Sequence, residues 1–595
     1  MPDYLEKNAG SIRSAYLSFV HGLGSQRILG KTIVDHLLIR PSLSAWWMSL
    51  VFESSHVSSS HLNDLLKLIS LIEWASENKV ISFHLVSDNL YLGEALSRWC
   101  NSSGVNYTCE SVSSRLHLLY YTRLLSPFIY TCRSLLFMLR YLLRFLMLRD
   151  SRAPRGLNYP ASLLFVNYSA NMSKDSLFRN TFQSAYWGSL IERLSSMGYP
   201  SNWLHVFVKD DVFDSCRTFT KVLNRLNKDS SRLQRHVSVD CSDTVYGIIR
   251  AFSVWLIIAL KSSFLFLNLK SFTSFNYLLP LIIRDWMESF IGPTSLSNLL
   301  FVSKFETILL NLPHQRLGFY LQENQPWEYA FLYAWKIGNH GTIVGVPHST
   351  VRFWDLRYFS DPNCLREPIP YSLPLPDLIG LNGPYALNTY KEALYPEEKL
   401  VKLESLRYSC IFEVERISTP TYNSHSHSQI KLIVFGDYVE AITLRQLRFL
   451  VDSLVLVEKP VSVFFKPHPV SSSNFLTKLN KNIKIVTKPI SQLLKEYDLY
   501  FVSSGSSSAV DLYFAGENVV TYLDPNIVNL SPLRGLASAQ YAKHTSDLAY
   551  YLNNRQSLRN YSVNPSEYFH YDSNLTAWTE LISSLIGSQG VTRSL

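Results

Sequence analysis

Apolar runs of strand length alternate with helix-patterned segments along most of this 595-residue chain. This alternation constrains the fold more than any other feature, because it is typical of parallel strands joined by helices. The pattern is most regular beyond residue 429, where the strand-like runs are IKLIVFGD, VSVFFKPHP, IKIVTK, DLYFVSSG and NVVTYLD. This part of the chain therefore predicts a parallel, doubly wound sheet with right-handed crossovers.

A second α/β region precedes this one. Strands are expected near residues 80–85, 162–167, 203–208, 318–323, 342–346 and 377–381. The segment PWEYAFLYAWKIGNHG is predicted to be a helix that begins at a proline and ends at a glycine, and it completes one strand–helix–strand unit. The polar segment TPTYNSHSHSQ, 419–429, indicates a linker between the two regions.

The expected fold class is α/β, with two Rossmann-like domains that face a cleft, because a chain of this length needs more than one core. Four parts are predicted: an N-terminal α/β region at 1–160, a Rossmann-like domain at 161–418 with a helical insertion at about 210–298, a second Rossmann-like domain at 430–560, and a helical tail at 561–595.

The formal net charge of +9 is concentrated in one stretch. Residues 111–149 contain six arginines and no acidic residue in an apolar background. On a helix, Arg133, Arg140 and Arg144 fall within roughly 20° of one line. A basic stripe on an apolar helix is typical of a helix that lies in the plane of a membrane surface. The alternative is a core helix whose arginines reach the surface.

No run of about 18 uncharged apolar residues occurs, so a membrane-spanning segment is not expected. The start, MPDYLEKNAG, lacks the features of a secretory signal. Seven scattered cysteines without a C-x-x-C pair argue against a disulfide framework and a zinc site. A cytoplasmic protein, peripheral at the inner face of the membrane, is predicted.

Three loops at the ends of the C-terminal strands carry polar residues, and ligands bind at that edge of open α/β sheets. Two prolines hold the loop that presents Lys466 and His468. A serine turn, 503–508, opens a helix whose free N–H groups favour an anion. A phosphate site is therefore predicted, although an N-cap and an ordinary loop are the simpler alternatives. Its residues are Lys466, His468, Ser504, Ser506, Ser507, Ser508 and Arg534.

The sequence contains neither a Walker loop nor a G-x-G-x-x-G turn, and it has no D-x-D triplet. A metal-held nucleotide is therefore not indicated, and no metal ligand is predicted.

A second set of candidates follows two successive strands of the first domain. If those strands are neighbours, Glu323 and His348 lie at one sheet edge as a possible general-base pair. Alternatively, Glu323 caps the next helix and His348 forms only structural hydrogen bonds. Arg352 and Arg357 could bind a carboxylate as bidentate donors. Ion pairs with Asp355 or Asp361 are the alternative.

Several long motifs also carry a family resemblance. The segment YLQENQPWEYAFLYAWKIGNHGTIVGVPHSTVRFWDLRYFSDP, together with FFKPHP, SSGSSSAVDLYFAG and NLSPLRG, resembles the bacterial surface-carbohydrate biosynthesis proteins. The HP dipeptide followed by a serine cluster is more distantly similar to the GT-B polysialyltransferases and the capsule Kdo transferases. The similarity begins at about Leu163, so the first 160 residues lie outside it.

The resemblance implies a metal-independent GT-B glycosyltransferase without a cofactor. It would transfer a sugar from a nucleotide donor, preferably a CMP-activated nonulosonic acid or Kdo, to a lipid-linked glycan. It implies that His468 and Ser506–Ser508 bind the donor phosphate and that a carboxylate of the first, acceptor-binding domain acts as the base. Polyol-phosphate transfer of the teichoic-acid type and a non-catalytic membrane-associated assembly protein remain alternatives. Nucleic-acid binding is not expected, because the arginines are embedded in apolar sequence.

Overall fold

The structure is a computed structural model. It describes residues 2–59, 61–110, 125–148, 163–210, 213–228, 233–269, 275–366, 370, 372–413, 429–468, 483–554 and 564–588. Most of the predicted linker, through residue 428, lies outside these ranges.

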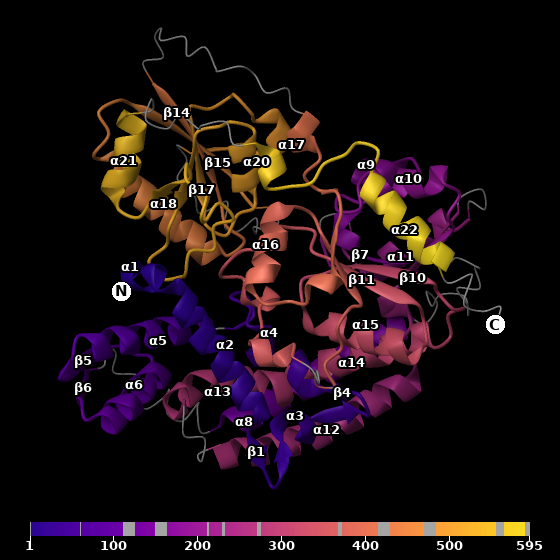
Figure 1. The fold of residues 1–595 in the computed structure, drawn as a ribbon, viewed down its shortest axis with the longest axis horizontal. Coiled ribbons are helices and arrows are strands. Elements are labelled where there is room, and N and C mark those ends of the chain that lie inside the picture. The colour runs from indigo at the N-terminus through magenta and orange to yellow at the C-terminus, as the bar shows by residue number, and fades with distance from the viewer. Residues whose placement is uncertain are drawn as a thin grey trace.

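The first domain is built on a seven-stranded parallel sheet (Figure 1). Its strands are β7 (Leu163–Tyr168), β8 (Ser201–Val206), β9 (Gln234–Ser238), β10 (Leu317–Leu321), β11 (Thr342–Val346), β12 (Leu378–Leu381) and β13 (Leu400–Lys402). Their order is β13-β12-β11-β10-β7-β8-β9. The strand order therefore reverses between β7 and β10, which is the point where ligands bind in such sheets.

The second domain repeats this design with six parallel strands. They are β14 (Ile430–Phe435), β15 (Val461–Lys466), β16 (Lys484–Ile485), β17 (Leu499–Ser503), β18 (Val519–Tyr522) and β19 (Gln540–Ala542), in the order β16-β15-β14-β17-β18-β19. The reversal falls between β14 and β17. Two doubly wound parallel sheets confirm the predicted α/β, GT-B-like fold class.

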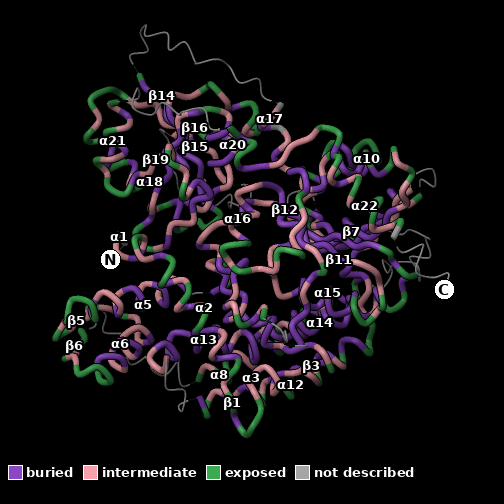
Figure 2. The backbone as a smooth tube through the Cα atoms, viewed as in Figure 1, coloured by how far each residue is buried: buried purple, intermediate pink, exposed green. Residues whose placement is uncertain are grey.

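The two faces of the first sheet are covered by different parts of the chain (Figure 2). One face packs on α14 (Pro293–Leu309), α15 (Pro326–Ile337) and the N-terminal helices α2 (Ala9–Ser25) and α5 (Leu62–Glu77). A buried ion pair between Arg40 and Glu306, with Nε···Oε1 2.6 Å, joins the N-terminal region to α14. The described part of the N-terminal 110 residues therefore shares a core with the first sheet.

The segment predicted as a helical insertion, 210–298, also contains a strand. It includes α11 (Cys216–Leu226), α12 (Val245–Asn268) and α13 (Leu279–Phe290), but β9 lies between α11 and α12. The sequence of β9, QRHVS, contains a single aliphatic residue, so its apolar pattern does not predict a strand. β9 is an edge strand, and its His236 is buried beside His205 of β8, with Nδ1···Nε2 3.1 Å.

Helix α8 (Ser126–Met147) contains the predicted basic stripe, but its charges are partly neutralised by the protein itself. Arg133 lies 3.1 Å from Glu288, and Arg144 lies 2.9 Å from Asp240. Only Arg140 of the three is exposed without an ion pair among the described residues. Two members of the predicted stripe therefore form ion pairs within the protein, and membrane contact through this helix stays a prediction.

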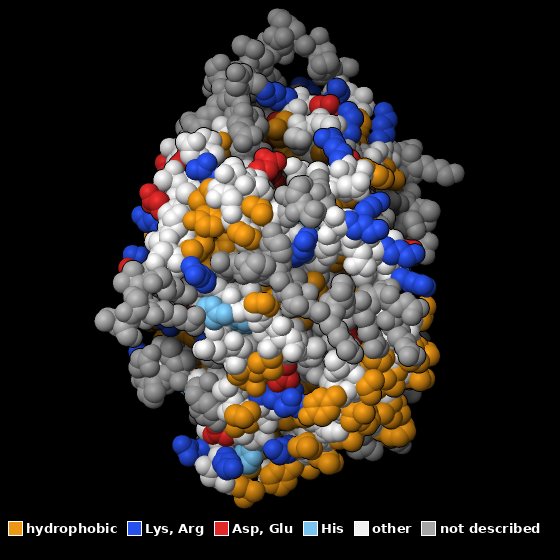
Figure 3. All heavy atoms as spheres, turned by 90° about the vertical axis from the view of Figure 1, so that its right-hand side faces the viewer, with side chains coloured by type: hydrophobic (Ala, Val, Ile, Leu, Met, Phe, Trp, Pro, Cys, Tyr) orange, Lys and Arg blue, Asp and Glu red, His pale blue; other side chains and the backbone are white. Residues whose placement is uncertain are grey.

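The outward face of α8 is apolar instead. Its exposed side chains include Phe128, Ile129, Leu135, Leu136, Leu139, Leu142, Leu143, Leu146 and Met147. Those of α12 include Val245, Tyr246, Ile249, Leu256, Ile257, Leu260, Phe264 and Leu267. Figure 3 shows hydrophobic side chains gathered over the lower part of the molecule, where Figure 1 places α12. We call the exposed apolar residues of these two helices the α8/α12 face.

Of the helices that the structure describes, α12 is long and apolar enough to cross a membrane by length and composition. One third of its most apolar 18-residue window, 33 %, is buried inside the protein. Its buried stripe, which includes Ile248, Ala251, Trp255 and Ile258, packs on α13 and α14. The helix is thus apolar on both its core face and its outward face.

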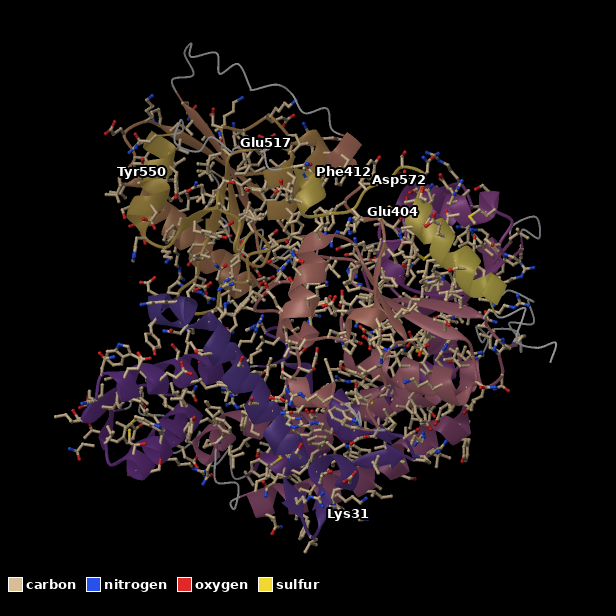
Figure 4. The ribbon with its side chains drawn as sticks, viewed as in Figure 1. Lys31, Glu404, Phe412, Glu517, Tyr550 and Asp572 are labelled. Atoms are coloured by element: carbon tan, nitrogen blue, oxygen red, sulfur yellow. The ribbon has the colours of Figure 1, made fainter. Side chains whose placement is uncertain are left out.

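The C-terminal segment returns to the first domain. Tyr568 and Phe569 belong to the core of the second domain, whereas α22 (Thr576–Ser588) packs on the first sheet. Glu404, labelled next to α22 in Figure 4, accepts hydrogen bonds from the backbone N–H groups of Ala577, at 2.8 Å, and Trp578, at 3.2 Å. This carboxylate caps the start of α22, and its negative charge interacts favourably with the positive end of the helix dipole.

We expect Trp578→Ala to destabilise the first domain by about 3–5 kcal/mol, the usual cost of deleting a buried tryptophan. The Trp578 side chain is fully buried against Trp187 and Phe319. Urea unfolding should show the first domain's transition shifted to lower urea. Ser583→Ala, at an exposed position on the same helix, is the control and should leave that transition unchanged. An unshifted transition in Trp578→Ala would show that α22 adds nothing to the domain.

Candidate active site

The carboxyl edges of the two sheets meet through arginine side chains of the first domain. Arg352 donates from Nη1 to the main-chain oxygen of Gly505 at 2.9 Å. Arg407 donates to the hydroxyl of Ser507 at 3.0 Å and to that of Ser349 at 3.3 Å. The serine turn predicted to bind phosphate and the loop that carries His348 and Ser349 therefore lie on opposite sides of Arg407.

Glu323 and His348 are brought together as the sequence predicted. Strands β10 and β11 are parallel neighbours with Leu321 opposite Val346, so the residues that follow them leave the same edge. His348 Nε2 lies 3.3 Å from Glu323 Oε1. The imidazole is nearly buried and stacks on Tyr186, with ring centroids 4.1 Å apart.

Glu323 does not cap the following helix, so the alternative role considered for it is wrong. Glu328 performs that function, because its carboxylate accepts hydrogen bonds from the backbone N–H groups of Glu323, Asn324 and Gln325 at 2.9–3.2 Å. The Glu323 carboxylate instead accepts a short hydrogen bond from the Gln325 side-chain amide. One carboxylate thus fixes the turn, and the other is held at the sheet edge.

The protonation of the pair favours a neutral imidazole beside a basic carboxylate. Burial lowers the pKa of His348 well below its usual value, and the neighbouring guanidinium groups of Arg407 and Arg357 lower it further. Burial also raises the pKa of Glu323, although Arg357 opposes the rise. A carboxylate with a raised pKa is a better proton acceptor than an exposed one. In the described part of the chain, His348 Nδ1 has no hydrogen-bond partner.

The two arginines predicted to bind a carboxylate have different surroundings. Arg357 forms a bidentate ion pair with Asp355, at 2.7 and 2.8 Å, and lies 3.6 Å from Glu323. This is the alternative role, so Arg357 is not available as a bidentate substrate ligand in this structure. Arg352 contacts the serine turn and forms no ion pair with Asp355 or Asp361 among the described residues.

The serine turn follows β17 at the reversal point of the second sheet. Asp437, which follows β14, accepts a short hydrogen bond from the Ser503 hydroxyl and another from the backbone N–H of Val439 at 2.9 Å. A side chain at Gly505 would collide with Asp437, because an added Cβ would lie 2.6 Å from its Oδ2. Asp437 therefore holds the turn in place, and no sequence motif marks it.

The serines of the turn have unequal roles. Ser504 Oγ is buried and has no hydrogen-bond partner in the described part of the chain. Ser506 Oγ accepts from the backbone N–H of Ser508 at 3.3 Å, and Ser507 is bound by Arg407. Helix α20 (Ser508–Phe514) has only seven residues, so its dipole is short. Positive charge at this turn comes mainly from the arginines of the other domain.

His468 and Lys466 leave the neighbouring strand β15. The His468 ring packs edge-on against Tyr438 with centroids 5.5 Å apart, so it lies beside the loop that carries Asp437. Burial lowers the pKa of His468, and Asp437 opposes this effect. Lys466 Nζ donates instead to the main-chain oxygen of Lys488 at 2.6 Å, on the β16 side. Its predicted phosphate contact would require this hydrogen bond to break.

Arg534 is bound elsewhere. Its Nε makes a short ion pair with Glu6 of α1 (Pro2–Lys7), and its guanidinium lies 3.9 Å from the ring centre of Phe353. The charge predicted for a phosphate thus pairs with an N-terminal helix, and its predicted phosphate contact would require this ion pair to break.

Arg407 is the residue that sequence reasoning missed. It lies in LESLRYSC, a segment without a recognisable motif. Its guanidinium packs near the rings of Tyr186 and Tyr408, at 5.1 and 5.2 Å, and it opposes the burial that raises the pKa of Asp511 to about 6. No sequence signal separates such an arginine from a surface one, because its role arises only where the domains meet.

Taken together, the site offers a carboxylate with a neighbouring neutral imidazole on one side. On the other side lie a serine turn, a histidine and arginine donors. This arrangement suits removal of a hydroxyl proton by the carboxylate and stabilisation of a departing phosphate by the donors. Across the described ranges, no group of three or more His, Cys, Asp or Glu residues is placed to hold a metal ion.

No protein-family model matches the sequence, and no curated protein matches it. Several solved structures show weak similarity to this chain. HepE from Anabaena, in complex with UDP and glucose, is 12% identical over 72% of this chain and 99% of its own, with a TM-score of 0.37. MurG from Acinetobacter baumannii is 11% identical over 72% of this chain and 100% of its own, with a TM-score of 0.36.

UDP-N-acetylglucosamine 2-epimerase from Rickettsia bellii is 10% identical over 73% of this chain and 99% of its own, with a TM-score of 0.39. Similarity at this level assigns no function. The resemblance to the surface-carbohydrate proteins and to the polysialyl and Kdo transferases therefore stays a prediction.

The depressed pKa of His348 predicts a pH-dependent stability. Below about pH 6.5 an unfolded chain binds a proton on this imidazole that the native state does not bind, so stability falls as the pH falls. We expect His348→Gln to lose this contribution, so that its melting temperature relative to wild type rises between pH 6.5 and 5.5. Calorimetry at pH 7.5 to 8.5 is the control range, where the difference should be constant. A difference that stays constant down to pH 5.5 would contradict a neutral native imidazole.

Proposed function

We propose that the protein is a glycosyltransferase that moves a sugar from a nucleotide donor to a lipid-linked glycan in the synthesis of a bacterial surface polysaccharide. The observation that carries this proposal is the Glu323–His348 pair at the edge of one sheet, joined through Arg407 to the serine turn of the other. A proton acceptor and a set of phosphate donors on facing domains are what sugar transfer from a nucleotide requires.

In this scheme Glu323 takes the proton from the acceptor hydroxyl as that oxygen attacks the anomeric carbon of the donor sugar. His348 orients the carboxylate through its Nε2. The bond between the anomeric carbon and the phosphate oxygen breaks, and the nucleotide leaves with the bonding electrons. Arg407, Arg352, His468 and the serine turn stabilise the leaving phosphate. Their charge supports a reaction that needs no metal ion.

The favoured donor is a CMP-activated keto-sugar acid, a nonulosonic acid or Kdo. Two observations support this class: Arg407 and Arg352 both approach the serine turn, and neither is paired with a carboxylate among the described residues. One could bind the phosphate while the other binds the sugar carboxylate. In this proposal Arg352 keeps its predicted role as a ligand of the sugar carboxylate. Arg407 takes the role of second arginine donor that was first expected of Arg357.

The function is tested by a binding screen of CMP, CDP, UDP and GDP, followed by turnover with the matching sugar nucleotide. Preferred binding of CMP and release of CMP from its sugar support the proposal. Transfer of phosphorus together with a polyol would identify the teichoic-acid type of reaction instead. Nucleotide binding without turnover would identify a non-catalytic assembly protein.

We expect Glu323→Gln to lower kcat by roughly 10²–10⁴-fold, the usual contribution of a general base. The change is nearly isosteric, so donor affinity should stay within a few-fold. Arg407→Lys should do the opposite, raising the donor Kd with a smaller effect on kcat, because a lysine cannot form the same pair of contacts. Glu398→Gln, at an exposed position in the same domain, is the control. Normal turnover by a folded Glu323→Gln would overturn the mechanism.

The proposed location is the cytoplasmic face of the membrane, with the α8/α12 face against lipid. Monomeric soluble proteins rarely expose so many neighbouring large apolar side chains without a function. The two helices are hydrogen-bonded to the same residue. Ser134 of α8 and Trp255 of α12 both donate to the main-chain oxygen of Ile291, at 2.7 and 3.0 Å. Exposed Arg140 and Lys261 add positive charge that suits anionic lipids.

Leu260 and Leu267 provide the sharpest test of this location, since 75% and 69% of their surface is exposed. Each leucine that enters lipid contributes about 1.5–3 kcal/mol. Replacing both by serine should therefore weaken binding to phosphatidylglycerol vesicles more than tenfold in a sedimentation assay.

The matched control is Val451→Ser with Val455→Ser, two exposed apolar residues at the end of α18 (Glu440–Leu454) in the second domain. This pair should bind vesicles like wild type. Equal loss in both double variants, or no loss in either, would contradict docking through the α8/α12 face.

A further inference from the structure

A cavity of about 670 Å³ lies beside the candidate active site and is built largely from parts of the chain outside the Rossmann-like core. Its walls come from α4 (Leu50–Glu53), α8, α13, α14 and the start of α15. Ser58 and Arg284 are exposed at its border, so the cavity is open to solvent there. The catalytic scheme uses none of these residues.

The charged side chains that line the cavity are mainly acidic. Three carboxylates, from Glu53, Asp285 and Glu288, line it together with the guanidinium of Arg284, and Arg133, outside the lining, lies 3.1 Å from Glu288. All three also accept hydrogen bonds from hydroxyl groups of this chain: Glu53 from Ser58 at 3.2 Å, Glu288 from Thr294 at 2.9 Å, and Asp285 through a short hydrogen bond from Ser59. Such acceptors match a ligand rich in hydroxyl donors and repel phosphate or carboxylate groups.

The remaining walls are aromatic. Tyr130, Phe301 and Trp327 line the cavity from α8, α14 and α15. Tyr130 and Phe301 are only half-buried, so part of each ring is accessible. Flat apolar surfaces between polar groups suit a ligand that has both apolar faces and hydroxyl edges, as a sugar ring has.

The cavity is one side chain away from the proposed base. Gln325 lines it and donates a short hydrogen bond to the carboxylate of Glu323. The indole N–H of Trp327 in turn donates to the Gln325 side-chain oxygen at 3.1 Å. A second link runs through Arg357, which lies 3.6 Å from Glu323 and also acts on Glu53, where it opposes the burial that raises the carboxyl pKa to about 7.

We propose that this cavity binds the neutral sugar residues of the acceptor and delivers a hydroxyl group past Gln325 to Glu323. The ligand class is an uncharged oligosaccharide of hexoses, deoxyhexoses or N-acetylhexosamines. That the bound glycan is an acceptor rests on the proposed function. The binding of a neutral glycan can be tested without turnover. Tyr130 belongs to α8, so a lipid attached to the same glycan would lie close to the α8/α12 face.

The test uses the full-length protein on an array of neutral tri- to hexasaccharides of these sugars, with sialylated and uronic-acid glycans as the anionic arm. We expect the wild type to be retained on a subset of neutral glycans only. Tyr130→Ala and Glu53→Gln should each lower that retention at least tenfold, because one removes a ring face and the other a carboxylate acceptor.

Phe128→Ala is the matched control, since this aromatic residue lies on the same helix but is exposed away from the cavity lining, at 68%. It should bind glycans like wild type. All variants are first checked for wild-type circular dichroism, and Phe301→Ala replaces any variant that fails to fold. Retention of anionic glycans, no retention at all, or equal retention by the cavity variants and the control would overturn the inference.

Turnover separates this inference from the proposed function. Suppose that no preparation consumes a nucleotide sugar, although glycan binding still depends on the cavity residues. This result would overturn the proposed function, and the cavity would remain assigned as a binding site for neutral glycans. Where transfer is observed, Tyr130→Ala should raise the acceptor KM at least tenfold and leave the donor KM and the hydrolysis of donor by water unchanged. An unchanged acceptor KM would overturn the inference while the proposed function stood.

Discussion

The guanidinium of Arg407 is the contact on which the candidate site depends. It bonds to Ser349 of the first domain and to Ser507 of the second, and it packs between two tyrosine rings. A charge in such surroundings needs several partners, because burial without them is costly. Here the partners come from both sheets, so the arginine holds the two halves of the site in register. The same charge helps to keep His348 neutral.

The position of the site follows from the topology of the two sheets. In each sheet the strand order reverses beside the strand that comes first in the chain. The reversal lies between β7 and β10 in one sheet and between β14 and β17 in the other. Glu323 and the serine turn stand at these two reversal points, and His348 follows the next strand. Loops at a reversal point diverge, which leaves room for side chains between them. The C-terminal segment then ties the sheets together, since Tyr568 packs in one core and Trp578 in the other.

The helices outside the Rossmann-like sheets connect this site to two further surfaces. Helices α13 and α14 support the α8/α12 face on their outer side, and they line the acidic and aromatic cavity next to Gln325. Under the proposed function, a glycan carried by a membrane lipid would approach Glu323 from the side opposite the serine turn. This division fits the charges, because the cavity is rich in carboxylates and the interdomain contact is rich in arginines.

The two parallel α/β domains were predictable from local patterning, because apolar runs of strand length are visible in the sequence. It also predicted that Glu323 and His348 share an edge, because neighbouring parallel strands end together. It left open whether Arg357 pairs with Asp355, and it did not indicate that Arg534 pairs with Glu6, Arg133 with Glu288 or Arg144 with Asp240. These partners, like the roles of Arg407 and Asp437, the strand β9 and the cavity, became visible in the folded structure. A charged side chain takes its role from whatever the fold places within a few ångströms, and no local pattern records those neighbours.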